Sequence, residues 1–215
     1  GNANDESGNG NDGIVKGAKL AKDRFGAFDS AYYFDGNSTI LLSDKLKIYS
    51  PTTSQGLTIS FWASKSTTGY VVTQYRNMSV AGSAFVTSLR TDYGEGGFHL
   101  IGNGTGVFQG SVNAKEQDWN HWVFRIFQGN VSASLNGVTN TYGNLPLNQS
   151  TNDTKFQIGD IENNFYNLLK GKIDDLRIYN RELSSEEIEL LFKKELSSPK
   201  KLYNSGTEVT ISASP

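Results

Sequence analysis

The 215-residue chain contains no cysteine, only two histidines, four prolines and one methionine. Without cysteine it can form no disulfide, no thiolate metal site and no cysteine nucleophile. It also lacks a run of about 20 apolar residues, the length that crosses a membrane as a helix, so we expect no membrane insertion. The metal ligands that remain abundant are carboxylate, amide and backbone oxygens, which favour hard cations such as calcium.

Charge of one sign is not in excess either. The 20 lysines and arginines nearly balance the 22 aspartates and glutamates, and the net charge is −2. Nucleic-acid binding needs a clustered cationic surface, so we expect no nucleic-acid partner. Apolar residues make up 36% of the chain and aromatic residues 12%, which is too many for a disordered segment and enough for one substantial core.

The composition and the spacing of apolar residues predict an all-β fold. The 23 glycines, ten tyrosines and twelve phenylalanines fit many short strands joined by tight turns. Leu57, Ile59 and Phe61 recur with a period of two, as in a strand with two different faces. About a dozen such strands indicate two antiparallel sheets packed as a sandwich or jelly roll. The strands predicted from this pattern include Ala31–Phe34, Leu57–Trp62, Tyr70–Tyr75, Ala84–Leu89, Phe98–Ile101, Trp122–Phe127, Val131–Leu135, Lys155–Gly159 and Lys172–Tyr179.

Two local signals fix a hairpin and a helix. Asn136-Gly137 follows an alternating segment, and this dipeptide tolerates the positive φ angles of a two-residue hairpin. Ser184 and Glu187 have the spacing of a capping box, and apolar residues at helical spacing follow them. We therefore expect one short helix that ends near Glu195 and lies with one face on the sandwich.

The ends of the chain differ in composition from its middle. Residues 1–13 are rich in Gly, Asn and Asp and are expected to pack on the sandwich as an irregular segment. Residues 14–195 are expected to form the jelly roll. Residues 196–215 contain a lysine- and proline-bearing stretch followed by the strand-like Glu208–Ser212, which predicts a linker and the start of a further module.

Several phrases resemble one known family. The segments that carry the resemblance are Phe34-Asp-Gly36, Leu57–Trp62, Trp119-Asn-His-Trp122, Leu135-Asn-Gly137, Ile158-Gly159, Gly171–Asn180 and Leu183–Ile188. In this order they are similar to the laminin-G-like, concanavalin A-like lectin/glucanase jelly roll of bacterial extracellular proteins. The resemblance covers residues 5 to about 194. It implies a secreted or cell-surface location and a chain cut from a larger exported protein, but the architecture serves lectins, adhesion modules and glycosidases alike.

No catalytic pattern is present. Retaining glucanases of this fold use a Glu-x-Asp-x-x-Glu strand that brings two carboxylates about 5 to 5.5 Å apart, and nothing in the chain matches it. Asp160 and Glu162 share a strand face but precede a loop-like Asn163-Asn164. His121 lies in a strand-entry phrase, where we expect packing or hydrogen bonding. We therefore expect a protein that is not an enzyme.

Calcium is the cofactor that the residues favour, and a first candidate site contains Asp35 and Asp174. Strand alternation places Asp174 with Leu176 and Ile178, the side expected to face the core. An inward carboxylate needs a cation or several hydrogen-bond donors. Asp35 is the expected neighbour, and related jelly rolls carry a structural calcium between the chain ends. The alternative is that Asp174 accepts backbone N–H groups.

A second candidate calcium site is the loop of Asp160, Glu162 and Asn163. In pentraxins, which this chain resembles in part, acidic side chains at this position hold calcium. The partner ligands of pentraxins come from the hairpin after the Phe-Trp strand, where Asn77 is the one counterpart in this chain. An acidic surface loop without metal is the alternative.

Sugar binding would use loop aromatic rings with polar companions. The first choice is Asn163-Asn164-Phe165-Tyr166 together with Tyr93, and the wider set adds Tyr70, Phe98, Arg90, Asp92 and Asn167. Trp62 and Trp122 are expected in the core. The sequence thus predicts a calcium-stabilised, non-catalytic module that binds extracellular polysaccharide or another glycan. The alternatives are an adhesion or spacer module that binds a cell-surface protein, and a divergent glycosidase.

Overall fold

A computed structural model of the chain describes residues 3–43, 56–64, 66–75, 85–90, 97–102, 106–111, 118–128, 130–144, 155–159, 169–197 and 208–211. These residues form β-strands and one helix, α1 (Ser185–Ser197). The strands are β1 (Ile14–Lys16), β2 (Lys19–Ala21), β3 (Ala31–Asp35), β4 (Thr39–Leu41), β5 (Leu57–Ser64), β6 (Gly69–Tyr75), β7 (Phe85–Arg90), β8 (Gly97–Gly102), β9 (Gly106–Ser111), β10 (Trp119–Phe127), β11 (Asn130–Leu135), β12 (Val138–Asn144), β13 (Lys155–Gly159), β14 (Lys170–Tyr179) and β15 (Glu208–Ile211). Among these residues no helix has the length and apolar composition to cross a membrane.

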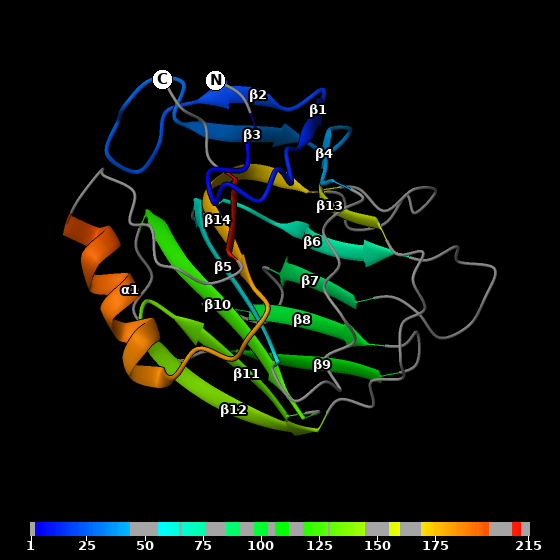
Figure 1. The fold of residues 1–215 in the computed structure, drawn as a ribbon, viewed down its shortest axis with the longest axis vertical. Helices are drawn as coiled ribbons and strands as arrows, with labels where there is room; N and C mark the ends of the chain where they lie inside the picture. The colour runs from blue at the N-terminus through cyan, green and yellow to red at the C-terminus, as the bar shows by residue number, and fades with distance from the viewer. Residues whose placement is uncertain are drawn as a thin grey trace.

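The strands form two antiparallel sheets, as the sequence predicts (Figure 1). One sheet has seven strands in the order β1-β4-β13-β6-β7-β8-β9. The other has eight, in the order β12-β11-β10-β5-β14-β3-β2 with β15 added to β14. The nine strand segments predicted from the two-residue period lie in these sheets, apart from Ala84, which is outside the described residues. Strands β1, β2, β4, β9 and β12 were not among the predicted segments, and the first three have only three residues each, too few to show a period.

The core lies between the sheets and is built from the residues that alternate along the strands. Phe61 and Ile59 of β5, Phe124 of β10 and Phe156 of β13 are all at most 1% exposed. Phe61 and Phe124 lie diagonally across the paired strands β5 and β10, with ring centroids 6.0 Å apart. Trp122 belongs to this core, whereas Trp62 is equally buried but alternates to the opposite face of β5.

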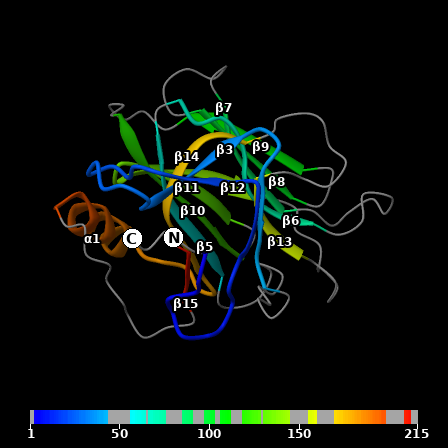
Figure 2. The same cartoon turned by 90° about the horizontal axis from the view of Figure 1, so that it is seen from above.

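Helix α1 covers the outer face of the eight-stranded sheet. The Ser184 hydroxyl accepts the Glu187 N–H at 3.2 Å, and the Glu187 carboxylate accepts the Ser184 N–H at 2.8 Å, so the predicted capping box is present. Ile188 packs with Val123 of β10 in a small apolar cluster. Figures 1 and 2 both place α1 on the side of the sandwich away from β6–β9.

The two ends of the chain join the sandwich. Ala3 is 2% exposed within the core cluster, and its carbonyl accepts the Gly13 N–H at 2.7 Å. At the other end, β15 pairs antiparallel with β14 from Leu176 to Tyr179. Residues 208–211 thus add to the eight-stranded sheet. The expected linker and start of a further module in residues 196–215 stay a prediction.

Candidate functional site

A register shift in β14 decides where its two aspartates lie. Pairing with β5 slips between Asp174 and Arg177, and Asp175 has a φ of +44°. Asp174 is opposite Trp62, on the outer face, while Leu176 belongs to the inter-sheet core. The expectation that Asp174 and Leu176 share a face is therefore wrong, because a bulge adds one residue and inverts the alternation. Strict alternation cannot show such a bulge in advance.

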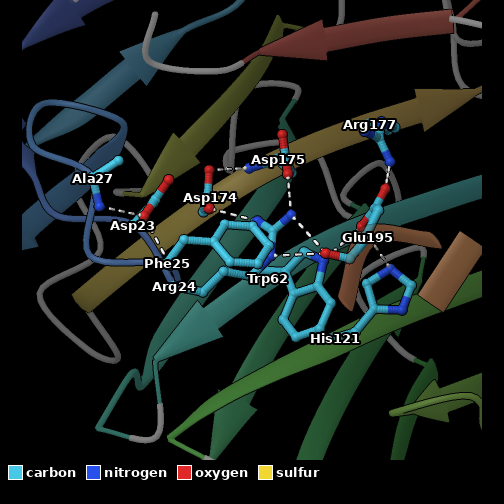
Figure 3. Close-up of polar contacts among 10 residues, drawn as sticks. All are labelled: Asp23, Arg24, Phe25, Ala27, Trp62, His121, Asp174, Asp175, Arg177 and Glu195. Atoms are coloured by element: carbon cyan, nitrogen blue, oxygen red, sulfur yellow. Dashed lines mark hydrogen bonds and ion pairs between the residues drawn. The ribbon is translucent and has the colours of Figure 1, made fainter. Parts of the chain in front are cut away.

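Arg24 of the β2–β3 hairpin holds both carboxylates (Figure 3). Its Nη1 donates to Asp174 Oδ2 at 2.6 Å, and its Nη2 lies 2.8 Å from Asp175 Oδ2. The Asp23 carboxylate accepts the N–H groups of Phe25 and Ala27, which folds the hairpin so that Arg24 turns inward. The guanidinium also lies 4.5 Å from the Phe25 ring centroid and 4.7 Å from that of Trp62.

A second ion pair lies beside the first, under the last turns of α1. Glu195 is 3% exposed and pairs with Arg177 of β14. The other Glu195 oxygen accepts the indole N–H of Trp62 at 2.5 Å, and the Glu195 backbone carbonyl accepts from Arg24 Nη2 at 3.2 Å. Strand β14, the β2–β3 hairpin and α1 are thus joined by buried charged groups that are far apart in sequence.

His121 completes the cluster as a neutral ring. It is fully buried, its Nε2 lies 2.8 Å from the Ser60 hydroxyl, and its ring stacks on Phe192 of α1. Burial, with the nearby positive charges of Arg177 and Arg24, lowers the pKa of His121 to about 3. The structural role expected for His121 is confirmed. Its buried position leaves no approach for a substrate.

The charges in the cluster balance only if one carboxyl is protonated. The three carboxyls of Asp174, Asp175 and Glu195 face two guanidinium groups. Burial and the neighbouring Asp175 charge together raise the pKa of Asp174, Arg24 opposes the rise, and the result is a pKa of about 8. A neutral Asp174 at pH 7 gives two cations and two anions, which suits a site removed from water.

The structure does not bring Asp35 and Asp174 together. Asp35 is paired in register with Lys170, four positions before Asp174 on β14 and therefore about 13 Å away along the strand. Asp35 is exposed and accepts the N–H of Asn37 at 2.9 Å, which with its other hydrogen bonds lowers its pKa. Asp174 has a guanidinium where calcium was expected, so these two residues do not fit a shared calcium site. Within the described ranges no group of three or more acidic or histidine side chains could hold a metal ion.

The seven-stranded sheet contains a register row of polar residues. Ile158 of β13 belongs to the core and is opposite Val72 of β6, and the pairing of β6 with β7 shifts between Val72 and Tyr70. The row crosses four neighbouring strands as Tyr70 (β6), Ser88 (β7), His99 (β8) and Gln109 (β9), each opposite the next. None of the described helical residues packs on this side of the sandwich (Figure 2).

The structure describes only some of the residues that were predicted to bind sugar. Tyr70 and Phe98 of the wider set lie in β6 and β8, at the strand positions that the sequence predicts for them. Their part in sugar binding stays a prediction. Tyr93, Asn163, Asn164, Phe165 and Tyr166 lie outside the described residues, as do Asp92, Asn167, Asn77 and the calcium candidates Asp160 and Glu162.

Three comparisons place the chain among known proteins. The family model of the laminin-G-type concanavalin A-like lectin/glucanases superfamily matches residues 34–189. No curated protein matches the chain. Domain 4 of the extracellular arabinanase AbnA from Geobacillus stearothermophilus, solved with arabinotriose, is similar with a TM-score of 0.64 and 21% identity, over 88% of this chain and 92% of that one.

Toxin binding domains share the fold as well. The binding domain of Paraclostridial Mosquitocidal Protein 1 has a TM-score of 0.67 and 19% identity, over 91% of this chain and 50% of that chain. The binding domain of botulinum neurotoxin serotype D has a TM-score of 0.62 and 15% identity, over 89% and 49%. The chain thus spans about half the length of these toxin domains. With two antiparallel sheets, one covering helix and a family match over most of its length, the chain belongs to the concanavalin A-like lectin/glucanase superfamily.

Proposed function

We propose that this chain is a non-catalytic carbohydrate-binding domain of an extracellular protein and that it tethers its parent protein to polysaccharide. The observation that supports the proposal is the fold shared with an arabinanase domain that was solved with arabinotriose. The register row of Tyr70, Ser88, His99 and Gln109 in the seven-stranded sheet offers residue types with hydroxyl, imidazole and amide groups for sugar hydroxyls and one aromatic ring for a sugar face.

The similar structures support the same reading. The arabinanase domain is similar over nearly its whole length and was solved with arabinotriose, and the toxin chains are a binding domain and a receptor-binding domain. The carboxylates that lie close together in the described part of this chain, Asp174 and Asp175, are buried and held by Arg24, so they are not placed to act as an acid and a nucleophile on a glycan.

Affinity electrophoresis tests the proposal directly. The chain is run through gels that contain arabinan, xylan, β-glucan or no polysaccharide, and we expect retardation in at least one of them. His99→Ala and Gln109→Ala should each weaken that binding by about tenfold, the loss expected when one well-placed polar contact is removed. Thr141→Ala, at an exposed position of β12, is the control and should leave the mobility unchanged.

The contrary results are equally clear. Absence of retardation in every gel contradicts carbohydrate binding and favours a protein-binding adhesion or spacer module. Release of reducing sugar from any of the polysaccharides contradicts the non-catalytic assignment.

Calcium remains part of the proposal at the second candidate site, Asp160, Glu162 and Asn163. A bound ion stabilises the folded state in proportion to its affinity. We therefore expect the melting temperature to fall in excess chelator and to recover when calcium is added back. Asp160→Asn combined with Glu162→Gln should remove the calcium response, while Asp35→Asn should keep it. An unchanged melting temperature in chelator contradicts a calcium site.

A further inference from the structure

A second surface of the molecule combines an exposed aromatic ring with unpaired cations. Lys19 of β2, Tyr33 of β3 and Lys172 of β14 are opposite one another in register. Tyr32, the neighbour of Tyr33, is 6% exposed and belongs to the core, so this row lies on the outer face of the eight-stranded sheet. Tyr33 is 41% exposed. These three residues are called the lysine–tyrosine row.

The row lies at the end of the sheet formed by β2, β3 and β14, opposite in strand order to β12 (Figure 1). The adjoining hairpin adds Phe28, which is 71% exposed, with Lys22 Nζ 4.2 Å from its ring centroid. Aromatic rings and ammonium groups therefore continue from the row along this edge of the sheet.

The lysines of this surface form no ion pair among the described residues, although the charge of Lys19 is one of the causes that lower the pKa of Asp35. In the part of the chain that the structure describes, no carboxylate lies within ion-pair distance of Lys19, Lys22 or Lys172. Asp35 lies two residues after Tyr33 on the same face of β3, and it is opposite Lys170 of β14. A chain with a net charge of −2 thus places Lys19, Lys22 and Lys172 together with Asp35 as their nearby carboxylate, and an excess of positive charge of this kind attracts an anionic ligand.

The geometry of the row selects among anionic ligands. Residues directly opposite on neighbouring strands have Cβ atoms about 5 Å apart, so a lysine side chain leaves the sheet on each side of Tyr33. A tyrosine ring offers a flat apolar face with a hydroxyl at its tip, which suits the face of a sugar ring. The flanking lysines then lie within reach of an acidic group on that sugar or on the next one along the chain.

We infer that the lysine–tyrosine row is a second glycan-binding site, selective for acidic polysaccharide. Tyr33 packs on a sugar ring, and Lys19 and Lys172 neutralise the acidic groups of the polymer. The site is on a different sheet from the row of Tyr70, Ser88, His99 and Gln109, so it goes beyond the proposed function and can be tested separately from it.

Binding measurements on the full chain test the inference. The probes are polygalacturonate (carboxylate groups), dextran sulfate (sulfate groups), uncharged dextran, and vesicles of phosphatidylserine and phosphatidylcholine. We expect binding to the acidic polysaccharides that weakens as salt is raised, because exposed charge pairs are screened. Lys19→Gln combined with Lys172→Gln should weaken it by about tenfold or more, and Tyr33→Ala by about fivefold.

The matched control is Lys193→Gln combined with Lys194→Gln, which removes two exposed lysines from α1 and gives the same net charge. This variant should bind as the unchanged chain does. Equal losses in both double variants would overturn the inference, since they would show an effect of overall charge. Binding to neutral but not to acidic polymers overturns this site and leaves the proposed function standing.

Two further results separate the remaining possibilities. Binding to the anionic vesicles without binding to either acidic polysaccharide overturns the inference in favour of a membrane surface. A stronger response to polygalacturonate than to dextran sulfate supports it with carboxylate as the acidic group, and the reverse supports it with sulfate. Circular dichroism of each variant shows whether the fold is kept.

Discussion

Two parts of the outer face of the eight-stranded sheet treat charge in opposite ways. Under α1 and the β2–β3 hairpin, Arg24, Arg177 and three carboxyl groups are buried and paired. On the open part, Lys19 and Lys172 flank the exposed Tyr33 and form no ion pair among the described residues. Charges removed from water must be matched one by one, whereas exposed charges can remain free for a ligand. The covered part therefore serves stability, and the open part is available for binding.

The substitution with the largest expected effect on stability is the replacement of Arg24. Arg24→Met keeps much of the side-chain volume but leaves Asp174 and Asp175 without their cation and the α1 end without its donor. We expect the free energy of unfolding to fall by about 3 to 5 kcal/mol, as for other broken buried pairs. Urea denaturation followed by tryptophan fluorescence measures the change.

Lys193→Gln is the control for Arg24→Met. It breaks the exposed pair with Glu189, at 2.6 Å, which we expect to contribute almost nothing. A loss of stability as small for Arg24→Met as for this control would show that the buried pairs do not hold the covered part together.

The second largest expected effect is the pH dependence of the free energy of unfolding that comes from Asp174. The pKa of Asp174 is raised above its ordinary value of 3.8 to about 8, so its stabilising effect is complete below pH 3.8 and is lost as the pH rises through 8. The unchanged chain should lose up to about 1 kcal/mol per pH unit between pH 7 and 9, and Asp174→Asn should be flatter there. Urea midpoints at each pH measure both chains, and equal slopes would contradict the assignment of the proton to Asp174.

His121 has the opposite effect to Asp174 on the pH dependence of stability. Its pKa is lowered from 6.5 to about 3, so the stability it confers is present above pH 6.5 and is lost as the pH falls toward 3. His121→Gln should therefore be less sensitive to acid than the unchanged chain between pH 6 and 4. Parallel midpoints for the two chains over that range would show that the ring is already protonated in the folded state.

The smallest effect is expected on the open part. Lys19→Gln combined with Lys172→Gln should leave the free energy of unfolding within about 0.5 kcal/mol of the unchanged chain, because exposed substitutions of this kind break no buried contact. A much larger loss in denaturation would mean that the lysine–tyrosine row is structural, and the contrast between the two parts of the face would disappear.

The fold could be predicted almost completely from local patterns. The alternation of Leu57, Ile59 and Phe61, the Asn136-Gly137 turn and the Ser184–Glu187 capping box each describe a few neighbouring residues, and each is present in the structure. The two positive φ angles of the turn, +50° and +82°, are those that this dipeptide permits. Such signals are reliable because the physics that produces them acts within one strand or turn.

The charged groups could not be predicted in the same way. Asp174 was recognised as an inward carboxylate, but calcium was expected as its partner, and Arg24 was not considered because 150 residues separate the two. The bulge that moves Asp174 to the outer face cannot be recognised from the alternation of apolar residues in β14. The exposure of Tyr33 depends on how β2 and β14 pair with β3, which the sequence of β3 does not show.

The sequence by itself determined the strands, the turn, the helix start and therefore the sandwich, because the period of apolar residues and the caps act over a few positions. Only the tertiary structure decided which cation meets which carboxylate, which face of β14 carries Asp174 and which aromatic ring stays in water. Those choices depend on strands that are distant in sequence and are fixed only when the two sheets, the hairpin and α1 pack together.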